Sequence, residues 1–202
     1  MTEQPATGEP LLEFLEVMRR LRRDCAWKRE QTHASLARYL TEELHETLDA
    51  IENGTADDLR EELGDLLLQI YFHAVIAEET GDFTLDDVAA GIVEKMRRRN
   101  PHVFGPDSVS SSAEINELWE SVKATERQRD SITDGIAPTL PALLYADKVL
   151  DRLGRAAGTP VVPTGDTLGD RLLALVAEAH AAGLDPEQAL RTATRRLLAT
   201  QT

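Results

Sequence analysis

The fold of this chain is decided by residues 36–70, which read LARYLTEELHETLDAIENGTADDLREELGDLLLQI. Leucine and isoleucine recur every three or four residues on both sides of Gly54, a spacing that places them on one face of an α-helix. Gly54 ends the first helix because glycine adopts the left-handed conformation cheaply, and Thr55 or Asp57 caps the second. A link of about five residues makes the two helices antiparallel neighbours. The sequence therefore predicts a helical hairpin, with helices over about 35–52 and 58–79.

The other periodic stretches also favour helices, because β-branched residues are sparse and no alternating run with a hairpin turn occurs. Gly81 ends the second helix of the hairpin, and Thr84 caps the next one. Ser111, with Glu114 three residues later, has the spacing of a capping box. Further helices are predicted over about 11–23, 84–100, 168–181 and 186–200, together with one that begins at Ser111 and contains Trp119.

The predicted fold class is all-α. A hairpin with two apolar stripes has little mass to cover them, so we expect a four-helix-bundle-like core that dimerisation completes. The pattern changes after Asp134, where glycine and proline recur, and residues 158–165 are typical of an ordered loop or linker. We therefore expect a main domain over residues 1–130 and a small helical extension over residues 131–202.

The composition limits the function and the location. The 202 residues include 22 Lys and Arg against 36 Asp and Glu, a formal net charge of −14, which disfavours binding to nucleic acid. Cys25 is the only cysteine and cannot form an internal disulfide, which suits a reducing compartment. There is no apolar run long enough to span a membrane and no signal-peptide pattern at the start. We expect a cytoplasmic protein without membrane or nucleic-acid partners.

The acidic residues are concentrated in the hairpin. The window from Thr41 to Asp65 holds ten acidic residues and one basic residue, Arg60. A solvated acidic face is the simplest interpretation of such a window. The positions of four of the carboxylates favour a site instead.

Four carboxylates fall on matching positions of the two helices. At roughly 100° per residue, Glu43 and Glu62 lie about 80° from the leucine stripe of their helix, and Glu46 and Asp65 lie about 140° from it in the same sense. Glu46 and Glu62 are each 8 residues from Gly54, and Glu43 and Asp65 are each 11 residues from it. In an antiparallel hairpin these carboxylates form two level pairs. Mg²⁺ prefers oxygen ligands and would relieve the repulsion between such charges.

A di-iron site is a weaker alternative. His45 follows Glu42 by three residues and forms one Glu-x-x-His unit, whereas a di-iron bundle needs two. Glu42 points almost opposite the leucine stripe, so we expect it either to be exposed or to support the metal ligands from outside. His33 and His73 are most simply structural, and Cys25 has no identifiable catalytic partner.

Several motifs follow one another between about Leu11 and Lys123. They are Trp27 with Glu30-Gln31-Thr32-His33, Glu42-Glu43-Leu44-His45-Glu46, Glu61-Glu62-Leu63-Gly64-Asp65-Leu66-Leu67, Arg98-Arg99-Asn100-Pro101-His102-Val103-Phe104, and Trp119-Glu120-Ser121-Val122-Lys123. The series resembles the MazG-type nucleoside triphosphate pyrophosphohydrolases, whose signature is EExxE followed by ExxD. The chain departs from the family at Cys25-Ala26-Trp27-Lys28, where Cys-Pro-Trp-Asp is common. It also has no second EExxE motif after residue 134, unlike longer relatives.

The resemblance implies an all-α dimer or higher oligomer. It also implies Mg²⁺-dependent hydrolysis of a nucleoside triphosphate between the α- and β-phosphates, which gives NMP and pyrophosphate and controls the nucleotide pool; Mn²⁺ is the expected substitute. The implied metal ligands and catalytic residues are Glu43, Glu46, Glu62 and Asp65, the same four that the hairpin geometry selects. A water activated by the metal and one of the glutamates would attack the α-phosphorus, and the residue that acts as the base is not identified.

A basic stretch and a tryptophan are the candidate substrate contacts. Lys95 shares a helix face with Arg98 and Arg99, where the three could contact the triphosphate or simply complement the helix dipole. Trp119, four residues before Lys123, could stack on a base, as the resemblance implies, or belong to the core.

Two functions of other classes remain as alternatives. The missing second motif and the altered loop are compatible with a non-catalytic nucleotide sensor or partner-binding scaffold, in which nucleotide binds without turnover. The third alternative is a helical interaction protein whose apolar stripes pair with another chain.

Overall fold

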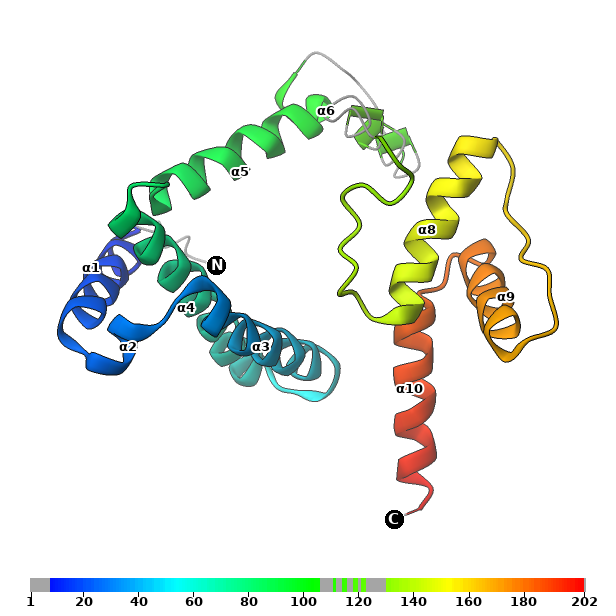
Figure 1. Ribbon diagram of the computed structural model, residues 1–202, viewed down its shortest axis with the longest axis horizontal. Coiled ribbons are helices and arrows are strands. Elements are labelled where there is room, and N and C mark those ends of the chain that lie inside the picture. Colours follow the sequence, from blue (N-terminus) through cyan, green and yellow to red (C-terminus); the bar gives the residue numbers. More distant parts are fainter. Residues whose placement is uncertain are drawn as a thin grey trace. The chain divides into compact units, whose positions relative to one another are not determined.

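A computed structural model describes residues 8–105, 111, 114–115, 118–119, 121–122 and 130–201. All the regular structure in these residues is helical, which confirms the all-α prediction. The helices are α1 (Glu9–Asp24), α2 (Ala26–Glu30), α3 (His33–Asn53), α4 (Ala56–Thr80), α5 (Leu85–Arg99), α6 (Pro101–Phe104), α8 (Ala142–Ala157), α9 (Leu168–Ala181) and α10 (Pro186–Ala199), as labelled in Figure 1.

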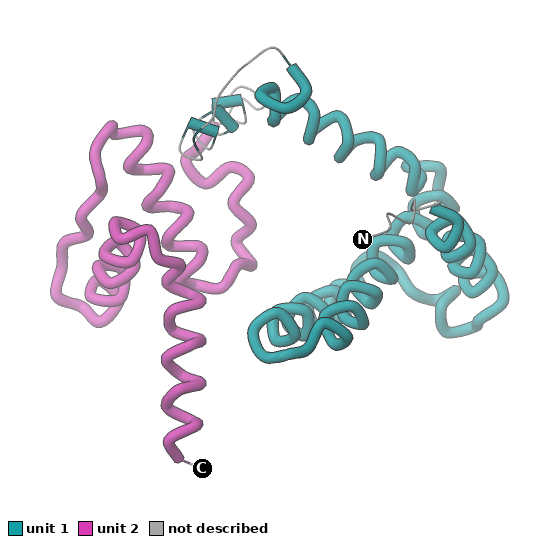
Figure 2. Tube along the Cα trace, turned by 180° about the vertical axis from the view of Figure 1, so that it is seen from behind, with its two compact units in different colours: residues 1–122 teal, residues 123–202 magenta. Residues whose placement is uncertain are grey.

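The chain divides into two compact units, residues 1–122 and 123–202 (Figure 2). The first unit contains α1 to α6, and the second contains α8 to α10. The boundary that the sequence suggests near residue 130 remains a prediction, because compactness does not show which segment folds on its own.

The predicted hairpin is formed by α3 and α4, which lie side by side (Figure 1). Thr55 is the N-cap of α4: its side chain accepts a hydrogen bond from the Asp58 amide, and the Asp58 carboxylate accepts one from the Thr55 amide. The capping boxes predicted at Thr84 and at Ser111 are also present, with Asp87 and Glu114 as their respective partners. Side-chain caps therefore fix where these helices begin.

Gly54 differs from the prediction. Its φ of −86° is not left-handed, whereas Gly81, which ends α4, is left-handed with a φ of 73°. Glycine is nevertheless required at position 54, because a Cβ atom there would lie 2.8 Å from the carbonyl oxygen of Ala50. The turn needs space rather than a positive φ.

The hairpin does not pack through its leucine stripes. The fully buried residues of α3 are Leu36, Thr47 and Ala50. At roughly 100° per residue this face is turned about 80° from the stripe of Leu40 and Leu44. Much of both stripes is therefore exposed along one flank of the hairpin, which we call the apolar flank: Leu40, Leu44, Ile51, Leu63 and Ile70.

The core of the first unit lies at the other end of α4. Its fully buried side chains come from α1, α3 and the second half of α4, and they are Met18, Leu36, Tyr71, Phe72, Val75 and Ile76. Two ion pairs hold α1 on α4, since Arg19 binds Glu78 at 2.5 Å and the buried Arg22 binds Glu79 at 2.8 Å. All the fully buried residues of α4 lie between Gln69 and Ala77, so the half of α4 nearer the turn is less covered.

The second unit contains a helix that the sequence analysis missed. Pro141 is the N-cap of α8, so this proline begins a helix instead of interrupting one. Leu150 of α8 and Val176 of α9 are buried in this unit, and His180 of α9 lies 2.9 Å from Asp147 of α8. The five-residue α2 was also missed, because so short an element carries no periodic signal.

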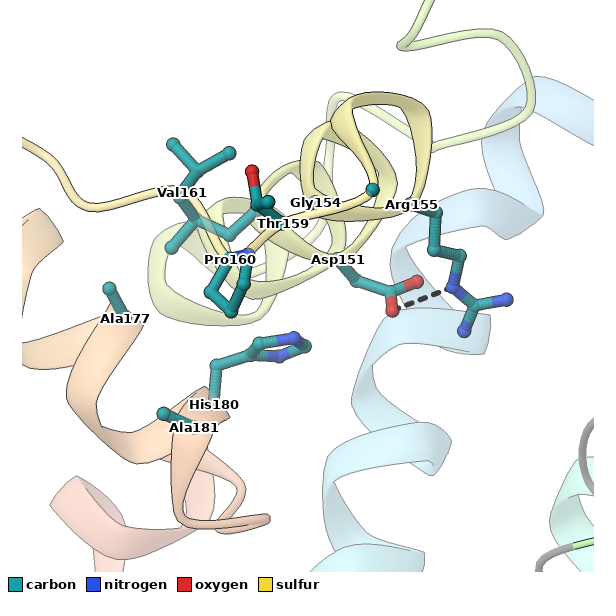
Figure 3. A pocket seen from close by; sticks show the side chains of 11 residues that line it. Asp151, Gly154, Arg155, Thr159, Pro160, Val161, Ala177, His180 and Ala181 are labelled. Atoms are coloured by element: carbon teal, nitrogen blue, oxygen red, sulfur yellow. Dashed lines mark hydrogen bonds and ion pairs between the residues drawn. The ribbon is translucent and has the colours of Figure 1, made fainter.

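A pocket of about 530 Å³ lies between α8, α9 and the segment 158–161 (Figure 3). Its surface is mostly apolar, and Figure 3 shows the imidazole of His180 lying close to Pro160. The charged side chains at its edge are already paired with each other, as the Arg155–Asp151 contact of 2.9 Å illustrates.

Candidate metal centre

Three of the four predicted carboxylates come together in the hairpin. Glu43 extends from α3, and Glu62 and Asp65 extend from α4. One oxygen of each lies within 4.8 Å of the others, and all three residues are half-buried. The tight turn at Gly54 sets this register, because it makes residues at equal distances from the turn lie level with one another.

Glu46 lies outside this cluster. It is exposed and lines a groove of about 550 Å³ next to the turn, together with Glu62 and Asp49. Glu43 and Glu46 differ because the face that α3 buries is turned away from its leucine stripe. Glu43 lies at the centre of this buried face, and Glu46 lies at its edge. Its charge still reaches the cluster, where it raises the pKa values of Glu43 and Glu62.

The electrostatics of the cluster are unfavourable without a cation. Burial raises the pKa of Glu43, and the charges of Asp65, Glu46 and Glu62 raise it further. Burial also raises the pKa of Glu62, with the charges of Glu46 and Asp65 adding to the effect. The Oε2 atom of Glu62 is buried and has no hydrogen-bond partner in the part of the chain that the structure describes. Carboxylates that are crowded, half-buried and incompletely paired fit a hard divalent cation.

The sequence analysis missed one polar residue beside the cluster. Gln69 is buried in α4, and its Nε2 donates a hydrogen bond of 3.5 Å to Oε1 of Glu43. The available signal was its sequence context, because Gln69 is the single polar residue in the run from Leu66 to Phe72. It also falls on the helix face of Glu62 and Asp65, at i+7 and i+4.

The predicted substrate contacts lie at the end of α5 and beyond it. Lys95 and Arg99 are half-buried, whereas Arg98 is exposed and pairs with Glu94 at 3.3 Å. The guanidinium of Arg99 lies 4.9 Å from the centre of the Trp119 ring, a cation–π contact. Arg99 and Trp119 are thus brought together. Lys123 lies outside the described residues.

The two histidines considered structural contact each other across the hairpin. Their rings are stacked, and Nδ1 of His33 lies 2.7 Å from Nδ1 of His73. At this distance at least one of the rings is neutral, because two protonated nitrogens could not face each other.

The geometry can be compared with known proteins. The family model for the MazG nucleotide pyrophosphohydrolase domain matches residues 31–104, which contain the whole α3–α4 hairpin. The nucleoside triphosphate pyrophosphohydrolase/pyrophosphatase MazG of Thermotoga maritima is 37% identical over 92% of this chain and 82% of its own length. The chain belongs to the MazG family.

Three further proteins are similar to this chain. The nucleoside triphosphate pyrophosphohydrolase of Escherichia coli K12 is 40% identical over 85% of this chain and 68% of its own length. The enzyme of that name from Mycobacterium tuberculosis is 42% identical, but this chain spans only 55% of its length. The crystal structure of a mazG-related protein from Thermotoga maritima matches 57% of this chain and 98% of its own, with a TM-score of 0.48 and 28% identity.

None of the described helices is both long and apolar enough to cross a membrane.

Proposed function

We propose that this protein hydrolyses nucleoside triphosphates to NMP and pyrophosphate in a Mg²⁺-dependent reaction. The observation that carries the proposal is the cluster of Glu43, Glu62 and Asp65, whose oxygens approach within 4.8 Å of one another in a chain of the MazG family. An acidic site of this kind repels a triphosphate unless cations intervene, so the cluster and the substrate are compatible only through a metal.

Glu43, Glu62 and Asp65 would hold the ion, and Glu46 at the edge of the buried face completes the proposed ligand set. Bound Mg²⁺, or Mn²⁺ in its place, supplies charge neutralisation for the phosphates and acidifies a coordinated water. One of the glutamates would accept a proton from a water whose oxygen forms a bond to the α-phosphorus. The bond from the α-phosphorus to the oxygen that bridges to the β-phosphate breaks, and pyrophosphate leaves.

Basic and aromatic side chains would bind the rest of the nucleotide. Lys95, Arg98 and Arg99 neutralise the phosphates, and Lys123 adds to this charge. The Trp119 ring stacks on the base. The Arg99–Trp119 contact supports this assignment, because it keeps a phosphate-binding cation beside an aromatic surface.

The cellular side of the proposal follows from the chemistry. A reaction that converts triphosphates to monophosphates controls the nucleotide pool, and its substrates are in the cytoplasm. The apolar flank of α3 and α4 supports a homodimer, in which two hairpins cover each other.

The test is to incubate the purified protein with Mg²⁺ and each nucleoside triphosphate and to separate the products. NMP with pyrophosphate is the expected result, whereas NDP with phosphate would contradict the assigned bond. Nucleotide binding without any product would favour the alternative of a nucleotide sensor.

Substitutions test whether the carboxylates are needed for turnover and not for folding. Glu43→Gln and Asp65→Asn are each expected to abolish turnover and to leave the helical circular dichroism unchanged. Glu42→Gln is the matched control, because Glu42 is an exposed neighbour on the same helix, with Arg38 3.7 Å away. Retained turnover in both cluster variants would overturn the metal assignment.

A further inference from the structure

Gln69 is a buried amide whose hydrogen-bonding capacity is poorly used. It is 4% exposed and lies in α4 where that helix faces α3. Its Oε1 is buried and has no hydrogen-bond partner among the described residues. A buried polar atom left without a partner destabilises the folded state, and an apolar side chain of similar size would avoid this cost. Folding alone therefore gives no reason for glutamine at this position.

Within the described part of the chain, the amide forms its hydrogen bond with the cluster. Nε2 of Gln69 donates to Oε1 of Glu43 over 3.5 Å. A carboxylate only accepts hydrogen bonds, so the amide must present its NH₂ group to Glu43 and turn Oε1 away. The orientation of Gln69 is thus set by Glu43, even though it leaves Oε1 unpaired.

The surroundings of Glu43 make this contact distinctive. The carboxylates of Asp65, Glu46 and Glu62 act on it with the same sign of charge. Gln69 is a neutral donor from the buried side, so it favours the ionised carboxylate and limits the directions in which it can point. A carboxylate repelled by its neighbours would otherwise rotate toward solvent.

We propose that Gln69 is a positioning residue that holds the carboxylate of Glu43 in place for a divalent cation. The inference rests on the proposed metal site. It assigns Gln69 no contact with the substrate and no part in proton transfer.

The experiment measures Mn²⁺ binding to the full chain by titration calorimetry, without nucleotide. Gln69→Leu removes the donor and keeps the side-chain volume. Loss of an outer-shell partner lowers metal affinity by about 10- to 100-fold, and we expect a decrease in this range. The unfolding temperature of the same variant in a chelator is expected to stay unchanged or rise, because the unpaired oxygen is removed as well.

Thr47→Val is the matched control. Thr47 is 5% exposed and close to the same carboxylate in sequence, but its hydroxyl donates to the backbone oxygen of Glu43 at 2.8 Å and not to the carboxylate. This variant removes a buried polar group of α3 without touching the donor to the carboxylate. Its Mn²⁺ affinity is expected to equal that of the wild type.

Three outcomes would decide against the proposal. Unchanged Mn²⁺ affinity in Gln69→Leu, or an equal loss in Thr47→Val, would show that Gln69 has only a packing role. Weaker binding together with a lower unfolding temperature would point to a structural role and overturn it too. A wild-type protein that binds no Mn²⁺ would remove both the site and its positioning residue. Wild-type binding without triphosphate turnover would instead contradict the proposed function alone.

Discussion

Glu43 lies at the centre of the face that α3 buries against α4, with Leu36 and Thr47 on the same face. The sequence was sufficient to select it, because its distance from Gly54 matches that of Asp65 and its angle from the leucine stripe matches that of Glu62. The sequence was not sufficient to separate Glu43 from Glu46. That difference depends on which helix face is buried, and the leucine stripes indicated a face turned by about 80° from the observed one.

Neutralising one carboxylate is expected to stabilise the metal-free protein. Burial and like charges raise the pKa of Glu43, so its ionised form is unfavourable in the folded state near pH 7. Glu43→Gln should therefore raise the unfolding temperature in a chelator by a few degrees, measured by circular dichroism. Glu42→Gln should leave it nearly unchanged. A lower unfolding temperature for Glu43→Gln would show that the cluster does not store repulsion.

Among the helices, the caps were the most predictable features. Thr84 as a cap and the pair of Ser111 and Glu114 were identified from the sequence. The reason is that a side chain three residues into a helix can reach back to the residue that starts it, as Asp87 does to Thr84. The packing faces were less predictable. Polar Thr47 and Gln69 are buried between α3 and α4, while leucines of the same helices are exposed. Hydrophobic periodicity alone predicts the opposite, with the leucines buried and the polar residues exposed.

The capping box at the start of α4 makes the helix sensitive to acid. Hydrogen bonds from the backbone and the hydroxyl of Thr55 lower the pKa of Asp58. A carboxyl with a lowered folded pKa stabilises the protein above its unfolded pKa, and this contribution is lost as pH falls through the folded pKa. Asp58→Ala should thus unfold at a lower temperature than the wild type at neutral pH.

The difference between Asp58→Ala and the wild type should shrink in strong acid, below the lowered folded pKa of Asp58, because the wild-type carboxyl is then protonated. The measurement is thermal unfolding at neutral pH and in strong acid. Asp57→Ala is the control, because Asp57 is exposed and contacts only the exposed Arg60 among the interactions described. A difference that stays constant with pH would mean that the charge of Asp58 does not contribute.

At the scale of the molecule, the apolar flank is the feature that most needs a partner. Leu44 is 48% exposed and Ile51 is 60% exposed on α3, and Leu63 and Ile70 extend the surface onto α4. The leucine stripes of α3 and α4 are both turned away from the α3–α4 contact in the same sense. In an antiparallel hairpin this places them on the same side of the hairpin. A second copy would cover this surface and build the expected four-helix core.

The wild type is expected to sediment as a dimer at micromolar concentration, and Leu63→Lys as a monomer, because a charge in the centre of the apolar flank would be buried on association. Leu12→Lys is the control, since Leu12 is equally apolar and exposed but lies on α1, away from the flank. A wild-type monomer, or an unchanged dimer in Leu63→Lys, would rule out this surface as the interface.

The second unit shows how context changes a motif. Leu168-Gly169-Asp170 repeats Leu63-Gly64-Asp65, yet Asp170 accepts hydrogen bonds from Thr167 and caps α9, whereas Asp65 lies inside α4 and joins the cluster. Between residues 135 and 167 the sequence carries no EExxE segment. The same three residues serve as a helix start in one unit and as a candidate ligand in the other.

The uneven coverage of α4 has a mechanical consequence. All of its fully buried residues lie between Gln69 and Ala77, so the end of the hairpin next to Gly54 is the part that opens locally most easily. An ion bound by residues of both α3 and α4 would link the two helices at that end and stabilise it. Backbone amides around the turn should then exchange with solvent more slowly once metal is added, while those from Tyr71 to Ala77 keep their rates. Metal binding and the loss of local motion in the hairpin would thus occur together.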